Sequence, residues 1–189
     1  MALYRYVSSK DELLVLLRDV AVGVPPPVPE HVTGRRAGLA HWAGAYRAVL
    51  HRHLWVLRVP VTGPPVTPSG VHWMEQALRS LADTPLDEGA KLGVVMLVDG
   101  YVRSEAALMA DLEASARANV TTVPEATAAY GELLVRLADP GHFPAVAAVL
   151  HSGVLAQSGA PDEDFRSGLE RVLDGVGALI EKGGNDERA

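Results

Sequence analysis

The sequence predicts an all-α protein, and three observations support this. Apolar residues recur at steps of three and four over several long segments, which is the spacing of one helix face. No segment alternates apolar and polar residues as a half-buried strand does. Proline and glycine clusters separate the periodic segments. Together these patterns predict about eight or nine helices in a helical bundle.

The first predicted helix covers residues 10–22. Ser9 precedes it and Glu12 follows three residues later, which is the spacing of a capping box. Asp11 and Glu12 fall in the first turn, where the helix dipole favours negative charge.

A proline-rich stretch divides the chain after this helix. Gly23 is a helix stop, and the prolines of segment 24–29 favour a stiff, extended backbone because proline fixes φ. We therefore predict a short N-terminal part at 1–23, a linker at 24–33 and a main domain at 34–189.

The main domain is predicted to contain a series of further helices. Their expected ranges are 34–54, a short turn at 55–59, then 70–82, 86–116, 124–138, 143–151 and 162–182. Ser69 is the expected N-cap of the third long helix, and Thr84 followed by Pro85 is expected to begin the next. Segment 92–98 is apolar on all sides, which predicts burial all round.

The last predicted helix carries a regular apolar seam. Phe165, Leu169, Val172, Val176 and Leu179 follow one another by four and three residues. Three glycines in the same helix lower its intrinsic propensity, and close approach of another helix would explain them.

Composition narrows the class of protein. Hydrophobic residues make up 48% and charged residues 21% of 189, which is typical of a folded globular chain. The net charge of −6 argues against a nucleic-acid-binding surface over most of the chain. There is no cysteine, which excludes disulfides and fits a cytoplasmic protein, and no apolar run is long enough to span a membrane.

No motif points to catalysis, a metal or a cofactor. The chain has no GxSxG, no glycine-rich phosphate loop and no HExxH, so no catalytic residue is proposed. His51 and His53 lie two apart and would point in different directions on a helix, so they cannot share one ion. The other histidines lack metal-ligand spacing.

The N-terminal residues resemble a family of regulators. The run Leu-Tyr-Arg-Tyr-Val at 3–7, followed by Ser-Lys-Asp-Glu-Leu-Leu at 9–14, resembles the end of the recognition helix and the start of the connecting helix in TetR-family repressors. Tyr6 stands where the family often has histidine.

Two later segments are similar to the C-terminal domain of a TetR subfamily. Residues 38–55 resemble its Arg-x-x-Leu-x-x-His-Pro-Trp segment, with Leu54 in place of the usual proline. Residues 164–175 resemble the family's ending.

The resemblance implies a function and a set of partners. It implies a homodimer joined by a four-helix bundle of the long central and final helices, here through the seam named above. It implies a small-molecule inducer enclosed by the C-terminal helices, and operator DNA that is released when the inducer binds. The resemblance places Tyr4, Tyr6 and Lys10 at the DNA backbone and Leu3 in the recognition helix or at a thymine methyl. Most of the family's DNA-binding head is not represented in the 189 residues, and we expect the natural protein to extend upstream.

An inducer pocket is expected around polar residues of the central helix. Asp99 and Arg103 lie four apart, close enough to pair on a helix. Pockets are mainly apolar with a few converging polar groups. The candidate ligand-binding residues are Trp42, Tyr46, Trp73, Met74, Met96, Asp99 and Arg103. A structural ion pair among ordinary core aromatics would explain the same residues.

Two other interpretations remain open. One is a headless dimer that binds a small molecule, or acts as a scaffold, without binding DNA itself. The other is an α-helical enzyme, for which the sequence suggests no substrate.

Overall fold

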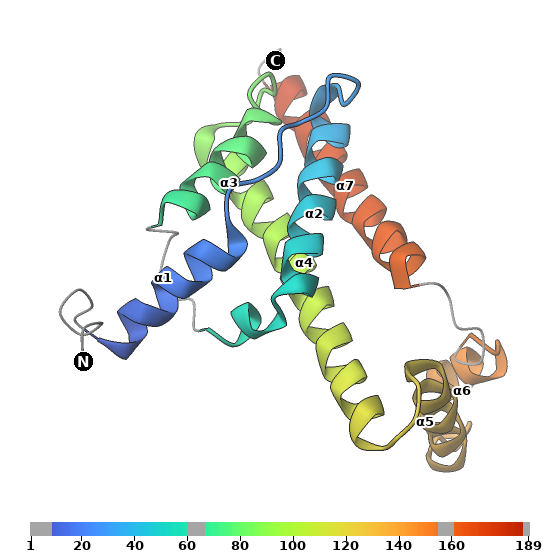
Figure 1. Ribbon diagram of the computed structural model, residues 1–189. Helices are drawn as coiled ribbons and strands as arrows, with labels where there is room; N and C mark the ends of the chain where they lie inside the picture. Colours follow the sequence, from blue (N-terminus) through green and yellow to red (C-terminus); the bar gives the residue numbers. More distant parts are fainter. Residues whose placement is uncertain (1–8, 60–66, 155–160, 187–189) are drawn as a thin grey trace, which may run out of the picture. The chain divides into compact units, whose positions relative to one another are not determined.

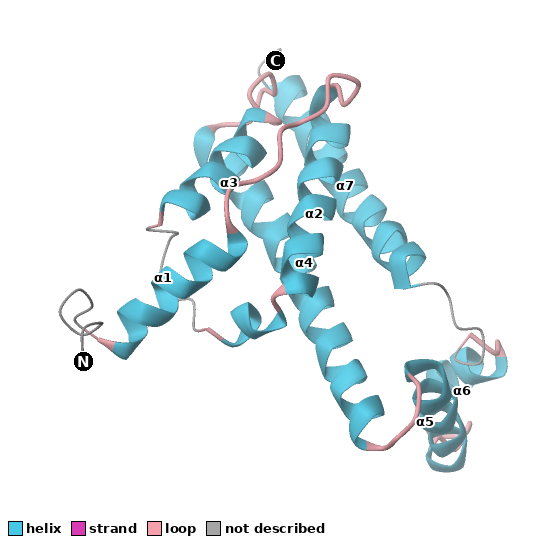
Figure 2. Cartoon of the chain, viewed as in Figure 1, coloured by secondary structure: helices cyan, strands magenta, loops and turns pink. Residues whose placement is uncertain are grey.

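The structure is a computed structural model that describes residues 9–59, 67–154 and 161–186. Within these ranges every regular element is a helix, so the predicted all-α fold is confirmed (Figures 1 and 2). The elements are α1 (Lys10–Val22), α2 (Gly34–Arg52), the 3-10 helix η2 (Leu54–Arg58), α3 (Pro68–Arg79), α4 (Glu88–Ala118), α5 (Val123–Leu137), α6 (Pro144–His151) and α7 (Pro161–Asp186).

The chain forms two compact units. The first unit comprises residues 1–107 and 168–189, and the second comprises residues 108–167. The boundaries fall inside α4 and inside α7.

The core of the first unit is formed by side chains of α2, η2, α3, α4 and α7. Helix α1 packs on α2 and α3, and α2 packs on α3 and η2. The largest fully buried side chains are aliphatic and come from three elements and one turn: Leu39, Leu50, Val56, Leu81, Val98 and Val102. Burying an aliphatic side chain of this size stabilises the fold by roughly 1.5–3 kcal/mol, so each of these side chains contributes to the stability of the unit.

The backbone that follows α1 is hydrogen-bonded to α3 in the first unit, at Gly23 and Pro26. The indole N–H of Trp73 donates to the Gly23 carbonyl at 2.8 Å, and the Gln76 amide donates to the Pro26 carbonyl at 2.7 Å. Asp19 of α1 accepts from the Ser69 backbone N–H at 3.0 Å. These bonds fasten the stretch to α3, and the predicted domain boundaries at 23 and 33 stay a prediction.

Helix starts follow local capping, with two corrections to the sequence prediction. Thr67, rather than Ser69, caps α3, because its hydroxyl accepts from the Gly70 N–H at 3.3 Å. Helix α4 begins after Asp87, whose carboxylate accepts from the Ala90 N–H at 2.7 Å. The predicted cap Thr84 instead donates its hydroxyl to the Leu81 carbonyl, so it belongs to the preceding turn. Ser9 caps α1 as predicted, accepting from the Glu12 N–H at 3.1 Å.

The apolar segment 92–98 of α4 is not buried on all sides, contrary to the prediction. Val94, Val95 and Val98 are buried, whereas Met96 is 67% exposed. Leu92 and Leu97 are also exposed. The buried valines lie on one side of the helix because a helix advances 100° per residue. The other side is open within the single chain.

Helix α7 packs part of its predicted seam within its own chain. Phe165, Leu169 and Val176 are buried, Val172 is half-buried, and Leu179 is 44% exposed. The buried positions follow one another along one side of the helix, together with two more residues, Leu173 and Ile180. Only the edge of the seam therefore remains free within the single chain.

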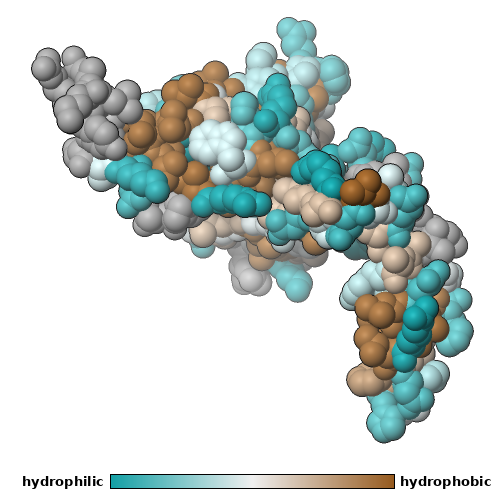
Figure 3. All heavy atoms as spheres, turned by 60° about the horizontal axis from the view of Figure 1, so that its bottom comes forward, coloured by the Kyte–Doolittle hydropathy of each residue, from teal (hydrophilic) through white to brown (hydrophobic). Residues whose placement is uncertain are grey.

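The second unit contains α5 and α6, which pack on each other. Thr122 and Glu125 form a complete capping box at the start of α5, with each side chain accepting from the other's backbone N–H. Hydrophobic side chains gather on the surface of this unit (Figure 3). Those that are exposed include Tyr130, Leu133, Leu137, Phe143, Val146 and Val149.

Candidate functional site

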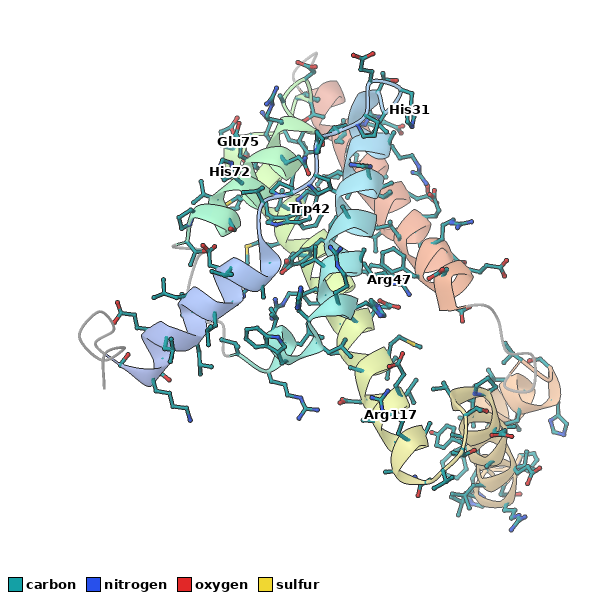
Figure 4. The ribbon with its side chains drawn as sticks, viewed as in Figure 1. His31, Trp42, Arg47, His72, Glu75 and Arg117 are labelled. Atoms are coloured by element: carbon teal, nitrogen blue, oxygen red, sulfur yellow. The ribbon has the colours of Figure 1, made fainter. Side chains whose placement is uncertain are left out.

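Three aromatic side chains meet between α2 and α3 in the first unit. Trp42, which is labelled in Figure 4, and Tyr46 come from one side of α2, and Trp73 comes from α3. The ring centroids lie 5.4 Å (Trp42–Tyr46), 5.9 Å (Trp42–Trp73) and 5.1 Å (Tyr46–Trp73) apart. All three side chains are buried. We call this group the aromatic cluster, and aromatic pairs at these distances attract beyond their area burial.

Each indole of the aromatic cluster has a hydrogen-bond partner. The Trp42 N–H donates to the Trp73 carbonyl at 2.8 Å, and the Trp73 N–H donates to the Gly23 carbonyl. Because a buried N–H without a partner is costly, these bonds fix both rings. The cluster thereby links α2, α3 and the residues that follow α1.

Charged side chains border the aromatic cluster. Arg103 of α4 donates to the Tyr46 hydroxyl at 3.3 Å. Asp99 lies one turn earlier on α4, and Arg18 of α1 is near enough to act on its charge. All three charged residues are half-buried. We call Arg18, Asp99 and Arg103 the charged edge.

The predicted pairing of Asp99 with Arg103 does not reach contact distance. With the residues that the structure describes, Asp99 forms no hydrogen bond or ion pair within 4.0 Å, and neither does Arg18. Burial raises the pKa of the Asp99 carboxyl above its ordinary value, and the positive charges of Arg103 and Arg18 act in the opposite direction. The charged edge is therefore an incompletely paired group in a partly desolvated place.

A second polar contact joins α2 to α4 nearby. Arg47 extends from α2 toward α4 and holds Glu105 with two hydrogen bonds of 2.9 Å (Figure 4). Their side chains are only 14% and 15% exposed. The His51 Nε2 atom lies 3.6 Å from the same carboxylate. Two parallel hydrogen bonds between a guanidinium and a carboxylate form a strong, well-oriented ion pair, and we call the Arg47–Glu105 pair the clamp between α2 and α4.

Two further predicted ligand-binding residues, Met74 and Met96, differ from each other in their exposure. Met74 on α3 is half-buried, and Met96 is on the open side of α4. The structure thus brings together Trp42, Tyr46, Trp73, Asp99 and Arg103. A ligand-binding role for all seven residues stays a prediction.

Sequence reasoning missed Arg18 as a member of this group. A usable signal was present, because Arg18 lies four residues after Leu14 and four before Val22, on the side of α1 that is half-buried. An arginine on such a side faces other helices rather than solvent.

The predicted DNA-binding residues can be placed only in part. Leu3, Tyr4 and Tyr6 lie outside the described residues. Lys10 is exposed in the first turn of α1.

A separate groove of about 480 Å³ lies between the start of α2 and α7. Leu39, Leu173 and Val176 contribute apolar lining, and Arg36 bridges α2 to Glu170 and Asp174 at its rim. None of the predicted ligand-binding residues lines this groove.

Two negative findings concern only the described part of the chain. There, no group of three or more histidine, aspartate or glutamate residues is placed to hold a metal ion. No helix among the same residues is both long and apolar enough to cross a membrane.

Comparison with known proteins adds a family and a set of relatives. A family model described as the tetracyclin repressor-like, C-terminal domain matches residues 28–180. The HTH-type transcriptional repressor DrrR1 of Streptomyces coeruleorubidus is 31% identical over 183 residues, which cover 95% of this chain and 66% of that protein. The chain therefore spans slightly less than two thirds of that relative's length.

Solved structures of the Streptomyces coelicolor TetR family protein ActR share the fold. The complex with actinorhodin has a TM-score of 0.71 and 23% identity, over 95% of this chain and 81% of that one. The complex with (S)-DNPA has a TM-score of 0.69 and 22% identity, over 93% and 79%. Apo ActR has a TM-score of 0.66 and 25% identity, over 97% and 81%.

Proposed function

This chain belongs to the tetracyclin repressor-like (TetR) family, and we propose that it is a ligand-responsive transcriptional repressor. In this proposal it binds a small aromatic molecule beside the aromatic cluster of the first unit, and operator DNA as a homodimer. The 31% identical relative is a transcriptional repressor, which supports the regulatory role.

The observation that favours a ligand site is the incompletely paired charged edge beside the aromatic cluster. A structural ion pair would close on itself, as Arg47 and Glu105 do with two bonds of 2.9 Å. Asp99 and Arg18 make no such closure with the described residues. Apolar surroundings with a few converging polar groups are the usual composition of a small-molecule site. ActR, which has the same fold, binds actinorhodin.

The open sides of α4 and α7 support a homodimer. Met96, Leu97 and Leu179 are exposed large apolar residues of the first unit, and adding a Cβ at Gly93 or Gly175 would meet nothing within 4 Å. Exposed apolar side chains on neighbouring turns are typical of protein interfaces. Within the predicted seam, a second copy can reach Val172 and Leu179 without disturbing the core.

Lys10 supports contact with DNA at the start of α1. Its side chain is exposed, and lysine contacts to phosphates strengthen binding without reading sequence. We propose the same role for Tyr4 and Tyr6, with Leu3 beside them.

Gel shift with the polypeptide isolated from its native source tests the repressor proposal. The DNA should come from the region upstream of its own gene. Lys10→Ala should weaken DNA binding because one phosphate contact is lost. The slope of the logarithm of the binding constant against the logarithm of the salt concentration should become shallower by roughly one. Lys182→Ala, an exposed lysine near the end of α7, is the matched control and should bind as the wild type does.

The results distinguish a DNA-binding repressor from a ligand-binding dimer that does not bind DNA. Specific retardation that is reversed by a bound aromatic compound would support the proposal. Aromatic compounds that bind while no upstream DNA is retarded would favour a ligand-binding dimer without DNA binding of its own.

A further inference from the structure

The second unit has more apolar surface than its own helices cover. Among its described residues, the buried hydrophobic side chains are those of Ala116, Ala147 and Phe165. Exposed large hydrophobic side chains are more numerous in this unit, and α5 and α6 carry most of them (Figure 3). An isolated helix of 15 residues or fewer is marginal in water, so α5 and α6 need a covering surface to stay folded.

The uncovered apolar surface of α5 forms one stripe. Tyr130, Leu133 and Leu137 are each more than half exposed and follow one another by three and four residues, so they share one side of the helix. We call them the α5 stripe. The charged residues of α5 lie on another side of the helix, which faces water: Glu125, Glu132 and Arg136. The α5 stripe is therefore the side of this amphipathic helix that is suited to a partner.

The open side of α4 continues from the first unit into the second. Leu97, in the first unit, and Leu108, in the second, are both more than half exposed. They lie eleven residues apart on one helix, which is about three turns, so they share one side to within about 20°. Gly100 and Ser104 lie between them on the same side and are also exposed. No charged residue interrupts this side of α4 between Leu97 and Leu108.

We propose that the second unit is part of the homodimer interface, with the α5 stripe packed against a second copy of this chain. This assignment rests on the proposed function, because it extends the same homodimer.

A second copy is the occupant that the chemistry of this surface favours. Permanent homodimer interfaces are more apolar and poorer in charge than interfaces with transient partners, and the α5 stripe contains no charged residue. The second unit needs its cover whenever the chain is folded, and another copy of the same chain is always present. A chain that packs along the open side of α4 also reaches the unit that carries the α5 stripe.

Photocross-linking of the purified full chain identifies what covers the α5 stripe. Tyr130 is replaced by the photoreactive aromatic residue p-benzoylphenylalanine, which on irradiation forms a covalent bond to a group in contact with it. We expect a product of twice the 20.0 kDa mass of one chain. The same replacement at Val135 is the matched control, because Val135 is exposed but lies about 140° around α5 from Tyr130. The control should give no product of that mass.

Leu133→Glu measures what the stripe contributes to association. Sedimentation velocity should show a dimer dissociation constant raised roughly tenfold or more, because a charge would enter an apolar contact. Leu133→Ala removes apolar atoms without adding a charge and should shift the constant in the same direction. Val135→Glu is the control: Val135 is 62% exposed, against 53% for Leu133, and this variant should associate as the wild type does. The three tryptophans all lie within residues 1–107, so their fluorescence verifies that the first unit is intact in each variant.

The outcomes distinguish this assignment from the homodimer of the proposed function. Cross-links confined to one chain, no cross-link at Tyr130, or unchanged association of Leu133→Glu and Leu133→Ala would overturn the assignment, while a dimeric wild type would leave the homodimer standing. A wild-type chain that sediments as a monomer would refute both.

Discussion

Replacing Gly38 by alanine tests the close approach of α2 to the end of α3. A Cβ built at Gly38 would lie 2.6 Å from the Ser80 hydroxyl oxygen and 3.0 Å from the Ser80 Cβ. Gly44 on the same helix is the matched control, since a Cβ there meets nothing within 4 Å and the residue is exposed.

Two opposing terms set the size of the effect. Replacing glycine by alanine inside a helix favours folding by up to about 1 kcal/mol. Inserting a methyl group into a packed contact costs about 1–3 kcal/mol. The Ser80 hydroxyl can rotate away, giving up its 3.3 Å bond to the Gln76 carbonyl, but its Cβ moves only with the backbone. Because the gain in helix propensity is common to both variants, we expect the Gly38→Ala protein to have a free energy of unfolding about 1–3 kcal/mol below that of Gly44→Ala.

Urea unfolding at fixed protein concentration measures this difference. All three tryptophans lie within residues 1–107, so their fluorescence follows the first unit. Ser80→Gly removes both close atoms and leaves only its Cα, 3.8 Å away. In that background Gly38→Ala should become as stabilising as Gly44→Ala. Equal stabilisation by both alanines in the unmodified chain would refute the close packing of α2 on α3.

Three further predictions concern the clamp, the charged edge and the dimer. Arg47→Met should lower the free energy of unfolding by up to about 3–5 kcal/mol, because it leaves the nearly buried Glu105 carboxylate without its partner. Urea unfolding measures this difference. A loss of less than about 1 kcal/mol would contradict a structural role for the Arg47–Glu105 pair. Asp99→Asn should stabilise the protein at neutral pH. Because the pKa of this carboxyl is raised in the folded state, the wild type loses stability as the pH rises from the ordinary pKa through the folded-state pKa. In acid the carboxyl is protonated in both states, so the stabilisation by Asp99→Asn should vanish there. Thermal unfolding of the two proteins across pH measures this. Leu179→Glu should give folded monomers in light scattering, because Leu179 is exposed. Leu169→Glu should instead unfold the first unit, because Leu169 is buried. A folded dimer of Leu179→Glu would exclude this side of α7 from the interface.

Much of the fold was predictable because helices are encoded locally. The apolar steps of three and four and the proline and glycine stops placed every described helix within a few residues. Ser9 was predicted correctly as a cap because its partner Glu12 lies only three residues away. Thr84 was a wrong prediction for the start of α4, since an equally good cap, Asp87, stands three residues later and sequence alone does not rank them.

The candidate site was predictable only in its composition. Trp42, Tyr46 and Trp73 were predicted as lining of a mainly apolar pocket, but their meeting depends on how α2 lies against α3. The pairing of Arg47 with Glu105 joins residues 58 apart, which no local pattern encodes.

The sequence by itself determined the helices, their order and the family, since capping and periodicity act within a few residues and the N- and C-terminal motifs are contiguous. Only the tertiary structure decided which side of each helix is covered. Segment 92–98 is apolar all round, yet Met96 stays open and Val98 is buried, because burial depends on neighbouring helices that are distant in sequence. For the same reason the structure, and not the sequence, divided the seam of α7 into a buried row and a free edge at Leu179.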